Sequence, residues 1–154
     1  MKRWEELERE ARDLATSGQS LIYQFGIGLG FLATVRRDGA PRLHPVCPIV
    51  ANGGLYVFVI PSPKLNDLRR DGRYALHAFP PAEADDEFAV TGRAIEIADP
   101  VVRQIIDSAY QNDAGPDEVL FELLLETCLL ARYEARGVFP PAYTHWSAQR
   151  SDVQ

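Results

Sequence analysis

Residues 55–71, LYVFVIPSPKLNDLRRD, decide the fold of this chain. The run from Leu55 to Ile60 is apolar and rich in β-branched and aromatic side chains, which predicts a strand. The pattern then changes, and a short helix is predicted with Ser62 as its N-cap and Pro63 at its first helical position. The chain therefore turns at this point from a strand into a helix.

The start of this helix has the chemistry of an anion site. The first turn of a helix exposes unpaired backbone N–H groups and the positive end of the helix dipole. Lys64 stands in that turn, where a cation is electrostatically misplaced unless an anion lies beside it. Together with the hydroxyl of Ser62, these donors predict a phosphate site. The alternative is that Ser62 only caps the helix and that Lys64 is solvated.

Composition is that of an ordinary globular protein and argues against some classes of partner. The 154 residues, 46% hydrophobic and 25% charged, predict a single domain over residues 1–154. The formal net charge of −6 argues against a general nucleic-acid or anionic-membrane binder, which needs a basic face. No stretch approaches the ~20 apolar residues of a membrane span, and the first residues do not resemble a signal peptide. Cys47 and Cys128 form no metal or redox motif, so we expect two reduced thiols in a cytoplasmic protein without a metal site.

The remaining sequence predicts short strands joined by turns, with helices at the periphery. We expect helices over 2–16 and 100–110, the second capped by Asp99, and strands over 31–35, 42–51, 74–79, 87–97 and 142–147. The second helix should turn Val101, Ile105 and Ala109 inward. Residues 118–135 are ambiguous, because their Leu, Glu and Ala favour a helix while a strand buried on both faces tolerates the same composition. Together these elements predict a mainly β fold, a small β-barrel with peripheral helices.

The predicted strand over 42–51 is the most informative for function. It contains two prolines, which cannot donate to a β-ladder, so it is irregular or unpaired on one side and open to a flat ligand. The two-residue period places Arg42, His44 and Val46 on one face. His44 is the best candidate for a group that titrates near neutral pH; the alternative is a hydrogen-bonded strand histidine.

Taken in order, these segments resemble a known family. GFLATVRRDGAPRLHPV at residues 30–46 is followed by the strand LYVFVI, the corner SPKLNDLRRDGRYAL at 62–76 and the strand FAVTGRAIEI at 88–97. The order G-x-L-A-T-V, D-G-x-P-R-x-x-P-V and S-x-K-x-x-x-L-R-x-D is similar to that of the pyridoxamine 5′-phosphate oxidase-like, FMN-binding split β-barrel superfamily. The resemblance covers roughly residues 28–98.

The resemblance implies a split β-barrel oxidoreductase that acts on a small molecule as a homodimer, with FMN at the subunit interface. It also implies that residues 118–135 form a strand. By position, Arg42, Ser62 and Lys64 would hold the phosphate, and His44, Val46 and Cys47 would face the ring, with Phe58 and Ile60 nearby. Arg69 would add charge near the phosphate, or it is an exposed helix arginine. Trp146 would cover the ring from the partner subunit, or it packs at an interface.

The C-terminus leaves the substrate and the cofactor open. It reads AYTHWSAQRSDVQ and does not match the arginine-containing segment of the oxidases that act on pyridoxamine phosphate. Other branches of the superfamily use a deazaflavin, bind haem, or have no known turnover. The alternatives are therefore a deazaflavin-dependent reductase and a non-catalytic flavin- or haem-binding protein. In the haem case His44 or another histidine would be an axial ligand.

Overall fold

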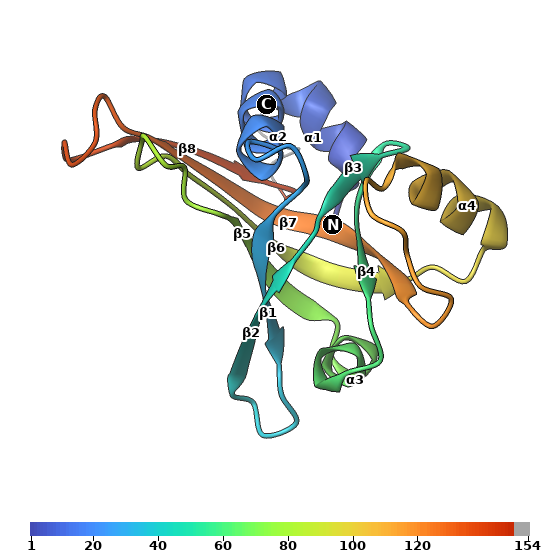
Figure 1. The fold of residues 1–154 in the computed structure, drawn as a ribbon. Helices are drawn as coiled ribbons and strands as arrows, with labels where there is room; N and C mark the ends of the chain where they lie inside the picture. The colour runs from blue at the N-terminus through green and yellow to red at the C-terminus, as the bar shows by residue number, and fades with distance from the viewer. Residues whose placement is uncertain (150–154) are drawn as a thin grey trace.

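The computed structural model describes residues 1–149 and is built around one curled antiparallel sheet (Figure 1). The strands are β1 (Gly30–Val35), β2 (Pro41–Val46), β3 (Ile49–Ala51), β4 (Gly54–Val59), β5 (Arg73–Ala78), β6 (Glu87–Glu96), β7 (Val119–Arg132) and β8 (Ala142–Ser147); the helices are α1 (Trp4–Glu10), α2 (Arg12–Ile22), α3 (Pro63–Arg70) and α4 (Pro100–Ala109). The sheet order is β2-β1-β5-β6-β7-β4-β3, and β8 pairs with β7. The predicted mainly β fold is confirmed.

The predicted strand over 42–51 is two strands that lie at opposite ends of the sheet order. Within residues 1–149, β2 pairs only with β1 and β3 pairs only with β4, although the two are joined in sequence by Cys47 and Pro48 alone. The expected single strand is therefore wrong, whereas the expectation that this segment is irregular or unpaired on one side is confirmed. The sheet curls so that α3 lies between the diverging ends of β2 and β4 (Figure 1).

The ambiguous segment is the longest strand of the described chain. β7 pairs with β6, β4 and β8, and its buried positions include Phe121, Leu123 and Leu125. Its ladder with β6 shifts register at Thr91 and Gly92. A side chain could not replace the hydrogen of Gly92, because a Cβ there would lie 1.8 Å from the carbonyl oxygen of Leu124.

The expected single helix over residues 2–16 is wrong, because the chain forms two helices that break at Ala11. Ala11 has φ −145° and ψ 61°, outside the helical region. The break lets both helices reach the sheet: Trp4 and Leu7 of α1 and Leu14 of α2 are all buried in one core. Tertiary burial therefore overrides a local pattern that contains no glycine or proline between the helices.

The predicted inward face of α4 is also wrong, although its cap is correct. Asp99 accepts a hydrogen bond from the backbone of Val101, as expected for an N-cap. The side chains of Val101 and Ile105 are 65% and 44% exposed, whereas Ile106 is fully buried in a small cluster beside β3 and β4. Two apolar stripes lie side by side on this helix, so the period alone cannot tell which one packs. None of the described helices is long and apolar enough to cross a membrane.

Candidate functional site

The inner face of β2 carries the predicted side chains Arg42, His44 and Val46. Burial alternates along the strand: Leu43, on the other face, is 64% exposed, while Val46 is buried in the main core. The two-residue period was therefore enough to assign the faces of this edge strand.

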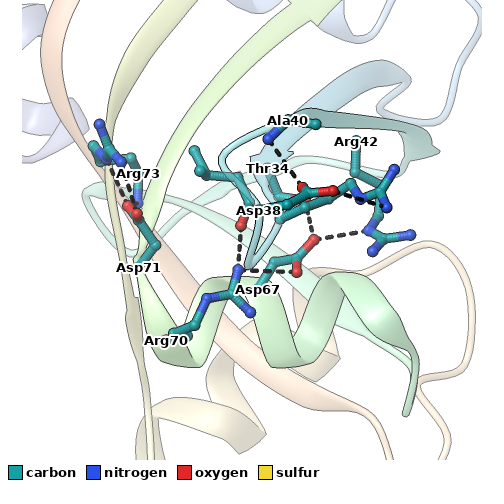
Figure 2. A network of polar contacts seen from close by, with 10 residues as sticks. Thr34, Asp38, Ala40, Arg42, Asp67, Arg70, Asp71 and Arg73 are labelled. Carbon is teal, nitrogen blue, oxygen red and sulfur yellow. Dashed lines mark hydrogen bonds and ion pairs between the residues drawn. The ribbon is translucent and has the colours of Figure 1, made fainter.

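One buried carboxylate organises the space between β2 and α3 (Figure 2). Asp67 is 3% exposed, and its Oδ2 accepts hydrogen bonds from Thr34 Oγ1 at 3.0 Å and from Arg42 Nε at 2.7 Å. Its Oδ1 accepts from Arg70 Nη2 at 3.1 Å, and the same nitrogen donates to the carbonyl of Val35. Burial would raise the pKa of Asp67, but the hydrogen bonds from Arg42, Thr34 and Arg70 outweigh it and hold the pKa below its ordinary value.

Sequence analysis missed Asp67. The sequence gives only a weak indication that Asp67 is buried: it is an acidic residue between Leu65 and Leu68, which are both buried. A buried carboxylate needs partners, and two arginines follow it in the sequence. The sequence does not reveal that the closest partner, Arg42, comes from a different element.

The first turn of α3 has no side-chain cap. Ser62 occupies the N-cap position, but its hydroxyl donates to the carbonyl of Ile60 at 2.8 Å, so the expected capping hydrogen bond is wrong. Lys64 is half-buried and makes no hydrogen bond or ion pair with any residue in the range 1–149. Burial lowers the pKa of Lys64. The helix start therefore combines uncapped N–H groups with a poorly solvated cation.

The imidazole of His44 lies beside this helix start. Its Nε2 is buried and has no hydrogen-bond partner among the described residues. Burial lowers the pKa of His44, and the positive charges of Lys64 and Arg42 lower it further, against the opposing effect of Asp67. Buried polar atoms are nearly always paired, so this nitrogen is suited to a partner from outside the chain.

The other predicted ring-facing residues lie toward α4. The ring of Phe58 is 5.4 Å from that of Tyr110, and the guanidinium of Arg103 lies 5.1 Å over Phe58. Cys47 is partly exposed and is a free thiol, and Ile60 is 53% exposed at the end of the strand that carries Phe58. Phe58 lies on β4, Ile60 follows that strand, and Cys47 lies in the connection between β2 and β3.

Arg69 and Trp146 are both engaged elsewhere in the subunit. Arg69 is exposed and forms two hydrogen bonds of 2.8 Å with the carboxylate of Glu96. The indole nitrogen of Trp146 donates to Glu10 at 3.0 Å on α1. Trp146 lies on β8, which pairs with one end of β7, whereas the strand of Phe58 pairs with the other end. Only a partner subunit could bring Trp146 to the candidate site.

Comparison with known proteins rests on structure, since no family model matches the chain and no curated protein matches its sequence. A haem-binding protein from Mycobacterium smegmatis superposes with TM-score 0.63 at 16% identity, over 85% of this chain and 57% of that protein. A putative pyridoxamine 5′-phosphate oxidase from Listeria innocua gives TM-score 0.58 at 17% identity, over 73% and 94% of the two chains. The chain has the split β-barrel fold of the pyridoxamine 5′-phosphate oxidase-like proteins.

A third solved structure, that of an F420 reductase, gives TM-score 0.53 at 18% identity, over 65% of this chain and 87% of that protein. At these identities the likeness concerns the fold alone. This split barrel also spans little more than half of the haem-binding protein. The three matched proteins thus share one architecture while their names refer to different cofactors and activities.

Proposed function

We propose that this split-barrel protein binds FMN and oxidises or reduces a small molecule as a homodimer, with the flavin at the subunit interface. The observation that carries the proposal is the unsatisfied helix start. Lys64 forms no hydrogen bond or ion pair with any described residue, although Cys47 and Glu118 act on it electrostatically, and the nearby His44 Nε2 is buried without a hydrogen-bond partner. A ligand with a phosphate and a hydrogen-bonding ring system would supply both partners.

The chain's residues would then bind and orient the cofactor. Lys64, Arg42 and the N–H groups at Ser62 would hold the phosphate, and the Ser62 hydroxyl would join them only after rotating away from the Ile60 carbonyl. His44, Val46 and Cys47 would lie along the ring, with Phe58 and Ile60 at its edge. Bound flavin supplies the hydride and electron transfer, while the protein positions it and excludes water.

The first test is an absorbance spectrum of the purified protein before and after addition of FMN, the deazaflavin coenzyme and haemin. Flavin absorbance that stays with the protein through gel filtration, and that NAD(P)H bleaches and oxygen restores, is the expected result. Retention of the deazaflavin alone, or of haem alone, would contradict the FMN proposal and identify the cofactor.

Replacement of Lys64 tests the phosphate site directly. Lys64→Ala removes one charge-assisted contact, and we expect FMN binding to weaken by about 1.5–3 kcal/mol in a fluorescence titration. Lys64→Arg keeps the charge and is the matched control, with a smaller loss. Equal FMN affinity in the wild type and in Lys64→Ala would remove this residue from the site.

A haem-binding function without turnover is the second candidate, and the buried Nε2 of His44 favours it. A neutral imidazole nitrogen without a hydrogen bond is available as an axial ligand. His44→Ala should then abolish the Soret band of added haemin. In the flavin proposal the same variant loses only one ring contact.

A further inference from the structure

A second charged feature lies between the β1–β2 hairpin and α3. It is a shallow depression of about 770 Å³, and its rim carries Arg36 and Arg37 from the hairpin turn, Arg42 from β2, and Arg69 and Arg70 from α3. We call it the arginine depression. Figure 2 shows Arg42 and Arg70 on either side of Asp67, with the hairpin turn above α3.

The arginine depression occupies a different face of α3 from the proposed phosphate site. Pro63, Asn66, Asp67 and Arg70 all line it, and their spacing of three, four and seven residues puts them on one side of the helix. Lys64 lies off this stripe and does not line the depression. Arg42 is the residue that the two places share.

Positive charge is concentrated here in an acidic protein. Five arginines line the depression together with Asp38 and Asp67, and Arg69 pairs in addition with Glu96, so an excess of two positive charges remains in a chain of formal net charge −6. Asp67 is buried, and both of its oxygens are taken by arginines and Thr34. Asp38 is exposed and lies 3.3 Å from Arg36. These carboxylates therefore compensate the cluster of like charges only in part.

Several guanidinium groups have donors to spare. Arg37 forms no hydrogen bond or ion pair within the described chain, and Arg42 uses only its Nε in the contact with Asp67. A guanidinium group can donate two parallel hydrogen bonds to two oxygens of one phosphate. No aromatic side chain lines the depression, so it offers nothing to stack against a flat apolar ring.

We propose that the arginine depression binds the phosphate group of a small phosphorylated molecule, a second ligand distinct from the flavin. Its volume lies within the range of small-molecule sites, roughly 300–1,000 Å³. The buried Asp67 fixes the directions of Arg42 and Arg70, and Arg36 and Arg37 approach from the hairpin. The phosphate belongs either to the molecule that is turned over or to a phosphorylated nicotinamide nucleotide that reduces the flavin.

The test is a calorimetric titration with pyrophosphate at low salt, on the protein as purified and again after saturation with FMN. The double variant Arg36→Ala/Arg37→Ala removes two exposed arginines of the turn that have no part in the flavin site. We expect its pyrophosphate affinity to fall at least about tenfold, with FMN affinity unchanged. Arg12→Ala, an exposed arginine on α2, is the matched control and should bind pyrophosphate like the wild type.

The outcomes separate this proposal from the flavin proposal. Lys64→Ala should weaken FMN binding and leave pyrophosphate binding intact, and pyrophosphate binding by a protein that takes no flavin still supports the second site. Three results would each overturn the proposal. They are displacement of FMN by pyrophosphate, equal pyrophosphate affinity of the double variant and the wild type, and binding of heparin by a protein that does not bind pyrophosphate. If the wild type binds NADPH more tightly than NADH and the double variant does not, the bound phosphate belongs to the nicotinamide nucleotide. If the wild type binds pyrophosphate but binds NADPH and NADH equally, the bound phosphate belongs to the substrate.

Discussion

At the residue scale, the carboxylate of Asp67 holds the guanidinium groups of Arg42 from β2 and of Arg70 from the end of α3. Burying a charge costs free energy, and a buried ion pair is often no more stabilising than apolar side chains of the same volume. Removing one partner, by contrast, leaves uncompensated charge and is strongly destabilising. The network therefore suits the orientation of arginines better than it suits stability alone.

Replacement of this carboxylate should be costly. Asp67→Asn keeps the shape but removes the charge that two arginines share, and we expect the free energy of unfolding in urea to fall by about 2–3 kcal/mol at pH 7. Because the pKa of Asp67 is lowered in the folded protein, its contribution is complete above the ordinary Asp pKa and is lost as pH falls through the folded value. Asp38→Asn, at an exposed ion pair, should change stability by less than about 0.5 kcal/mol. Equal effects of the two variants would contradict this account.

His44 should make stability fall with falling pH, as Asp67 does, but in a higher pH range. Its folded-state pKa lies below the ordinary value, so the unfolded chain binds the proton more readily, and unfolding becomes easier as pH falls through about 6.5. We expect His44→Gln to show a weaker loss of stability than the wild type between pH 7.5 and 5.5. His145→Gln, at an exposed histidine on β8, is the control substitution. A His44→Gln slope identical to that of the wild type would refute the coupling.

At the scale of elements, sequence predicted strands and turns well and failed where packing decides between local alternatives. The corner from β4 to α3 followed from Pro63 and from the change of period, which are local features. The identity of β7 did not follow from its composition, because burial on both faces allows leucines that elsewhere build helices. The break at Ala11 and the packed face of α4 depend on where the sheet lies, which no local pattern contains.

Substitution of Gly92, at the register shift in β6, tests how closely β6 and β7 must approach. Gly92→Ala would bring a methyl group to 1.8 Å from a backbone oxygen that cannot rotate away, so β6 and β7 would have to separate. We expect the free energy of unfolding, followed by circular dichroism in urea, to fall by about 3 kcal/mol. In Gly115→Ala the nearest atom would be 3.8 Å away, and this control should stay within about 0.5 kcal/mol of the wild type. Comparable stability of the two variants would show that the sheet relaxes around the extra methyl group.

At the scale of the whole molecule, the candidate site is assembled from segments that are distant in sequence. Thr34, Arg42 and Asp67 come from β1, β2 and α3, and they meet because the sheet curls around the helix. The resemblance and the helix start predicted Arg42 and Lys64 as site residues. No sequence pattern could predict the arginine depression, because that feature exists only when the hairpin and α3 face one another.

The assembly state is the prediction that belongs to this scale. If the flavin lies between subunits, the protein should sediment at about twice its chain mass of 17.2 kDa, and dilution should release flavin and separate the subunits together. Analytical ultracentrifugation with detection at a flavin wavelength measures both at once. A monomer that retains FMN with undiminished affinity would contradict the interface placement.

The short connection between β2 and β3 also limits which parts of the sheet can move apart. Three peptide links separate Val46 from Ile49, so their Cα atoms can never lie more than about 11 Å apart, however far the rest of the two strands diverges. The connection keeps β2 and β3 close together at this point. If β2 and β4 move apart, the gap between them must therefore widen at the other end, where α3 lies. A visiting molecule should therefore enter past the helix, and its rate of entry should follow the mobility of α3.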